Sequence, residues 1–218
     1  MVERPISEKL RAKIDESKLL STELGQLVNS LRFSANTRNR LSGGCFDLAF
    51  EYHIGVIELV ESRVAACAFA LLRILYEAHI HGVWLQFVAG DDDLRNYQLS
   101  RTKPLDRMVR AISIHPTWKS TGYAEFQAYA KNILDDYVHA GFRAVSRRIS
   151  ADAIEQAHDV EQEIEALEFA NVLSLMSTQQ IVFMAGNAEI AASFEARALE
   201  LLKRSRFTYT GKSKLVGQ

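Results

Sequence analysis

The sequence predicts an all-α protein: an antiparallel helical bundle with long central helices and an additional C-terminal helix. Apolar residues recur at spacings of three and four along most of the chain, as they do on one face of a helix. The alternating pattern of half-buried strands is scarce, and the Asn-Gly and Asp-Gly pairs typical of hairpins do not occur. Only three prolines occur, so nothing interrupts a helix between Pro5 and Pro104.

The composition is that of a folded globular protein. The chain has 218 residues, of which 48% are hydrophobic and 24% are charged. Its net charge of −1, from 26 basic and 27 acidic residues, gives no general attraction to nucleic acid or to anionic membranes. Binding of that kind therefore requires a local surface. The two cysteines, Cys45 and Cys67, are too few for a disulfide framework in a chain of this size.

We expect one helical domain over residues 1–204, with its core at about 45–185, followed by a loose basic tail at 205–218. The N-terminal residues show no signal peptide. Residues 169–188 are uncharged, but their many amide and hydroxyl side chains indicate a buried helix rather than a lipid-facing span. These observations predict a cytoplasmic protein with no membrane partner.

The first half of the chain is expected to form three long helices. The first covers about 7–33, with Ser7 as its N-cap, and the polar, glycine-containing segment 34–44 is expected to be a loop or a broken helix start. The second covers about 45–62. The third, at about 64–89, is apolar almost all round, which predicts a central position.

The second half is expected to begin with short helices. Three aspartates at 91–93 place carboxylates at the positive end of one of them. A short helix is expected between Pro104 and Pro116, and a longer one at about 123–149. An apolar helix then reaches about Ala185, where Gly186-Asn187 ends it, and a last helix covers about 188–204.

Arg73 and Glu77 are the only formally charged residues of the third helix. They are four residues apart, so they share a face, and on an apolar helix we expect both to be partly buried and paired. One interpretation is a structural ion pair that fixes the register of the helix. The other is a site where Arg73 contacts an anionic ligand or an RNA phosphate and Glu77 holds it in place.

His139 lies beside the stripe of apolar residues that we expect to face the core in this helix. Asp135, Arg143 and Arg147 flank it at steps of four, and a histidine beside a carboxylate and arginines suits acid/base work on a phosphate. The alternative is an interfacial histidine on a solvated, charged flank. The core stripe consists of Leu134, Val138, Phe142, Val145 and Ile149.

His53 lies on the apolar stripe of the second helix, where a satisfied core histidine is the common outcome, although it could face Arg73. Asp136-x-x-His139 and Glu155-x-x-His158 each resemble half of a di-iron carboxylate motif. Glu155 and His158 lie in a strongly polar stretch that does not favour an inward position. We therefore expect no metal and no other cofactor.

Two stretches together resemble an uncharacterised family of bacterial all-helical proteins, filed as a domain of unknown function. One joins Phe50–His53 to Ala70–Ala78 and Gly82–Leu85, and the other joins Leu134–Gly141 to Arg147-Arg148. That family is similar in turn to HEPN-type helical domains, many of which are RNases in toxin–antitoxin or phage-defence systems. The HEPN spacing of an arginine and a histidine is matched by Arg73 and His79, with five residues between them.

The resemblance implies a metal-independent endoribonuclease with RNA as its partner. In this hypothesis Arg73 binds the scissile phosphate, Glu77 orients Arg73, and His139 is the acid/base with Arg147 stabilising charge. His53, Arg143 and Arg148 are the expected binding residues. The alternative is a non-catalytic helical module that binds a partner or forms a homodimer through an apolar surface, with no identifiable small-molecule ligand.

Overall fold

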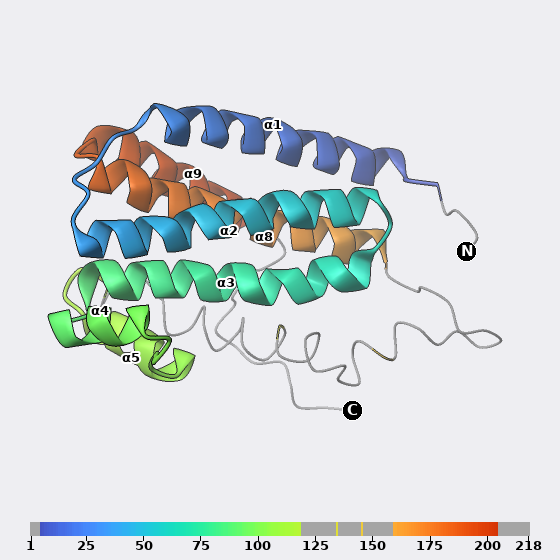
Figure 1. Cartoon of the computed structure of the whole chain (residues 1–218). Helices are drawn as coiled ribbons and strands as arrows, with labels where there is room; N and C mark the ends of the chain where they lie inside the picture. The colour runs from blue at the N-terminus through green and yellow to red at the C-terminus, as the bar shows by residue number, and fades with distance from the viewer. Residues whose placement is uncertain (1–4, 119–133, 135–144, 146–158, 205–218) are drawn as a thin grey trace.

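The computed structural model describes residues 5–118, 134, 145 and 159–204, and every regular element in these ranges is a helix. This confirms the predicted all-α class. In Figure 1, α2 and α3 lie side by side, α1 lies along α2, α8 and α9 lie behind them, and the short helices α4 and α5 lie at one end of α3. The helices are α1 (Glu8–Ser30), α2 (Thr37–Glu61), α3 (Ala65–Phe87), α4 (Asp91–Gln98), α5 (Leu105–Ile114), α8 (Val160–Met184) and α9 (Ala188–Arg204).

Side-chain caps fix where three of these helices begin. The Oγ of Ser7 accepts from the backbone N–H of Leu10 at 3.3 Å, as predicted for the start of α1. Asn36 and Asp159 cap α2 and α8 in the same way, each through a side-chain oxygen. Gly186, at φ +80°, then separates α8 from α9 because its left-handed backbone conformation favours glycine.

The predicted loop or broken start at 34–44 is wrong over most of its length. Helix α2 begins at Thr37, eight residues before the expected start, because Asn36 satisfies a free N–H at its end. Gly43 lies within this helix, where a Cβ would be 3.0 Å from the ring of Phe33. The glycine therefore permits close packing rather than marking a turn.

The helix expected at 123–149 lies outside the described residues except at Leu134 and Val145, which are both helical. Leu134 is 3% exposed and belongs to the main core cluster, as the predicted stripe requires. Val145 is 45% exposed, so the prediction that it faces the core is wrong. A helix face is buried only as far as neighbouring elements cover it, and that cover does not extend to Val145.

The main core cluster draws on α1, α2, α3, α4, α5 and α8, and a second cluster joins α9 to α1 and α8. Leu10 and Ile14 are fully buried in the main cluster, so the core of the described part begins before the predicted limit at residue 45. The single domain over 1–204 stays a prediction. None of the described helices combines the length and the apolar character that a membrane-spanning segment needs.

Helices α2 and α3 approach each other closely at Gly82. The ring of Phe46, which is 0% exposed, occupies the space where a Cβ on residue 82 would stand. This contact fixes the register of the two helices, because only glycine leaves room for the ring.

We predict that Gly82→Ala destabilises the protein by about 1–3 kcal/mol, since the added methyl group overpacks a filled core. The matched control is Gly44→Ala, also within a helix, where an added Cβ meets no described atom within 4 Å. It should stabilise α2 by up to about 1 kcal/mol. Urea unfolding measures both changes. A Gly82→Ala midpoint equal to or above that of the wild type would show that the packing constraint is absent.

Candidate functional site

Arg73 and Glu77 form the pair that their spacing predicts. The Nε of Arg73 donates to Oε1 of Glu77 at 2.5 Å across one turn of α3. The Arg73 side chain is 15% exposed and that of Glu77 is 39% exposed, so the pair lies at the boundary between core and solvent. A charge-assisted bond at this boundary holds the guanidinium in a defined plane while leaving the carboxylate accessible.

Tyr76 connects this pair to α5. Its side chain is 0% exposed, and burial is the main reason why the pKa of its phenol is raised. The charge of Arg73 lowers this pKa, whereas those of Asp106 on α5 and Glu77 raise it. The charge of Asp106, in the first turn of α5, and the charges of the Arg73–Glu77 pair thus act on the same buried hydroxyl.

His53 is 0% exposed and lies in the core, where it contacts α8. Its Nε2 bonds Oδ1 of Asn171 at 2.8 Å, and Nδ2 of Asn171 donates to Oγ of Ser17 at 3.0 Å. Because the amide oxygen can only accept, the ring carries its proton on Nε2. Burial lowers the pKa of His53 to about 4, so it is neutral at pH 7. His53 therefore has no exposed surface with which it could contact a ligand directly.

The two histidines that follow Arg73 also have structural partners. His79, the HEPN-spaced histidine, is 1% exposed; its Nδ1 bonds Oγ of Ser177 on α8 at 2.9 Å, and burial lowers its pKa to about 3. The Nδ1 of His81 lies 3.2 Å from the hydroxyl of Tyr97, which is also 3.2 Å from Sγ of Cys45. Burial lowers the pKa of His81, and the nearby charge of Glu77 partly opposes that effect.

The other predicted site residues lie outside the described part of the chain. These are His139, Arg143, Arg147 and Arg148, together with both half-motifs for a di-iron centre. Leu134, five residues before His139, is buried in the main core cluster. Among the residues that the structure does describe, no three His, Cys, Asp or Glu side chains are placed to hold a metal ion.

We did not predict a concentration of unneutralised arginines at one end of the bundle. Among the arginines whose side chains the structure describes, six make no ion pair with a carboxylate. The signal was present in the sequence, because residues 94–118 hold five basic residues and one acidic residue. We call the following set the basic end: Arg32, Arg38, Arg40, Arg101, Arg107 and Arg110.

The model of a family of unknown function (DUF6988) matches residues 46–201, which are 156 of the 218 residues. The matched range contains Arg73, Glu77 and His139. No curated protein and no solved structure matches the chain.

The burial of His53 predicts an acid-sensitive fold. Its pKa is about 4 when folded and about 6.5 when unfolded, so below pH 6.5 the unfolded chain binds a proton that the folded chain does not. Stability therefore falls between pH 6.5 and 4, by about 3 kcal/mol from His53 alone. We predict that His53→Gln makes the free energy of unfolding less dependent on pH in this window, as measured by urea unfolding at each pH. Parallel curves for the variant and the wild type would contradict the assignment.

Proposed function

This chain belongs to a family of unknown function (DUF6988), and from that premise we propose that it is a HEPN-like endoribonuclease that cleaves RNA without a metal ion. A bacterial toxin or phage-defence system is the setting that we propose. The observation that carries the proposal is the Arg73–Glu77 pair, which places the only two formal charges of α3 next to each other at the edge of the core. The Arg73 guanidinium loses part of its hydration at this position, and an apolar residue would avoid that cost in a purely structural helix.

The proposed reaction is attack of a ribose 2′-oxygen on the adjacent phosphorus. The new P–O2′ bond forms as the P–O5′ bond breaks, the 2′-hydroxyl loses its proton, and the leaving 5′-oxygen gains one. His139 is the residue that we propose for these proton transfers, since an imidazole titrates near neutral pH. The products are then a 2′,3′-cyclic phosphate and a 5′-hydroxyl.

Arginine side chains supply the positive charge that this reaction needs. The Arg73 guanidinium would bind the phosphate oxygens on which negative charge develops, with Glu77 fixing its plane through Nε. Arg147 would add charge stabilisation, and Arg143 and Arg148 would bind neighbouring phosphates. His53 has no place in this reaction, because it is buried and bonded to Asn171.

A second candidate is a non-catalytic module that dimerises. It is favoured by apolar side chains along the seam between α2 and α3, where Leu48 is 39% exposed and Ile74 is 44% exposed. Gly55 and Leu71 bring the two helices together within this seam, since a Cβ on residue 55 would be 2.8 Å from Leu71. Such a band is typical of surfaces that pack against another chain.

We predict that the purified protein cleaves total tRNA and that Arg73→Ala and His139→Ala each reduce the rate by about 100-fold or more. Each variant is first shown to be folded by circular dichroism. The control is Arg197→Ala, which removes an exposed arginine of α9 that pairs with Glu23, and should leave the rate unchanged. Gel electrophoresis of the products measures the rates.

Absence of cleavage by the wild type, over a range of divalent metals, would contradict the endoribonuclease and favour the dimerising module. Equal activity of the wild type and the two site variants would place the reaction elsewhere on the chain.

A further inference from the structure

The basic end differs from the rest of the described chain because its arginines make no ion pairs with carboxylates. Nine basic side chains elsewhere or beside it are neutralised by a carboxylate within 4.0 Å, whereas the six arginines of the basic end are not. Arg32 and Arg38 donate to backbone carbonyls instead. Arg40, Arg101, Arg107 and Arg110 are exposed. An excess of positive charge is therefore gathered in one region of a chain whose net charge is −1.

Helix α5 presents two of these arginines on one face. Its buried side consists of Met108, Val109 and Ile112, which pack into the main core cluster. Arg107 and Arg110 are three residues apart on the opposite, exposed side, so their side chains are neighbours. The burial of one side thus orients the guanidinium groups outward.

Lys103 lies in the loop between α4 and α5 and contacts residues of α3 and α4. Its Nζ pairs with Oδ1 of Asp93 at 2.9 Å and lies 5.4 Å from the centre of the Trp84 ring. These contacts tie the loop between α4 and α5 to the end of α3. The exposed Arg101 in this loop is therefore presented from an anchored segment.

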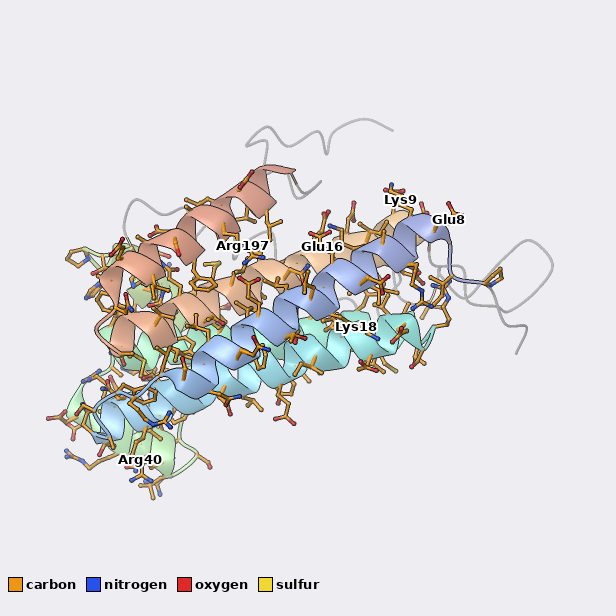
Figure 2. All side chains as sticks on the ribbon, turned by 90° about the horizontal axis from the view of Figure 1, so that it is seen from above. Glu8, Lys9, Glu16, Lys18, Arg40 and Arg197 are labelled. Carbon is orange, nitrogen blue, oxygen red and sulfur yellow. The ribbon has the colours of Figure 1, made fainter. Side chains whose placement is uncertain are left out.

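The ends of α2, α3 and α8 meet in this region. Nη1 of Arg38 donates to the carbonyl of Leu85 at 2.6 Å, and Oγ of Ser42 lies 3.7 Å from Sδ of Met184. Figure 1 shows α4 and α5 at this same end of the bundle. Figure 2 shows Arg40 there, at the opposite end of the bundle from Glu8 and Lys9.

An aromatic cluster lies at the same end of the bundle, where α3 and α8 end. The ring of Phe87 is 5.4 Å from that of Trp118, 6.2 Å from that of Phe183 and 6.4 Å from that of His115, between centroids. Phe183, at the end of α8, is 52% exposed. An exposed ring supported by other rings is a surface on which an unpaired nucleobase can stack, and arginines beside it can bind the phosphates of the same strand.

We propose that the basic end and Phe183 together form a binding surface for single-stranded RNA, with phosphates on Arg101, Arg107 and Arg110 and a base stacked on Phe183. This inference rests on the proposed function, because that function identifies the polyanion as RNA.

The test is fluorescence anisotropy with a labelled 12-nucleotide single-stranded RNA, titrated with the full chain carrying His139→Ala to prevent cleavage. In this background we expect Arg107→Glu/Arg110→Glu to weaken binding at least about tenfold and to reduce the slope of log K against log salt by about 1.4, for two lost phosphate contacts. Phe183→Ala should weaken binding about tenfold with little change in that slope, because stacking carries no charge.

The matched control is Arg11→Glu/Arg197→Glu, which changes the net charge equally on α1 and α9. The proposal requires this control to bind RNA as the parent does. Equal weakening by the control and the α5 variant would overturn it, since the effect would then follow net charge alone. Equal affinity for single-stranded DNA of the same sequence would overturn the assignment to RNA.

Cleavage assays separate this inference from the proposed function. RNA binding that is lost in the α5 variant, without cleavage by the wild type, supports the surface and contradicts the enzyme. Cleavage by the wild type that is unchanged by Arg107→Glu/Arg110→Glu and by Phe183→Ala supports the enzyme and overturns the surface.

Discussion

Helix α8 is buried on almost every side and yet carries amide and hydroxyl side chains, and the neighbouring helices provide hydrogen-bond partners for two of the most buried of them, Asn171 and Ser177. A buried polar group left without a partner costs about 1–3 kcal/mol. Asn171 therefore bonds His53 of α2 and Ser17 of α1, while Ser177 bonds His79 of α3. These contacts join α1, α2 and α3 to α8 at defined positions along its axis, and so fix the register of the bundle.

This requirement determines which histidines can perform chemistry. His53 and His79 are both neutral and committed to hydrogen bonds with α8, so neither can exchange protons with a substrate at neutral pH. The charged side chains of the candidate site lie outside this network, at the edge of α3, where Arg73 and Glu77 pair, and at the basic end. The proposed acid/base role therefore belongs to a histidine outside the core network, and His139 is the candidate that the sequence offers.

The apolar periodicity was sufficient to predict most of the helices. The limits of α9 match the predicted range, and Ser7, the aspartates at 91–93 and Gly186 mark helix ends as expected, because these residues act through local backbone chemistry. The start of α2 was missed because Gly43 has the local signature of a turn. Its actual role, making room for Phe33, depends on a tertiary contact that no local pattern reveals.

The candidate site was predictable only in part. The Arg73–Glu77 contact follows from a spacing of four on one helix, so it could be inferred from the sequence. The partner of His53 lies 118 residues further along the chain, and such a pairing depends on how the helices pack. The basic end likewise joins arginines from α2, α5 and two loops, which become neighbours only when the ends of the bundle are assembled.

The most direct test of the proposed reaction is the chemistry of the RNA ends produced by the wild-type protein in the presence of EDTA. Attack by the 2′-oxygen requires a 2′,3′-cyclic phosphate on one fragment and a 5′-hydroxyl on the other, and mass spectrometry of a short cleaved RNA identifies both. The account predicts these ends at a rate that EDTA does not change. A 5′-phosphate, formed only when a divalent metal is present, would contradict it.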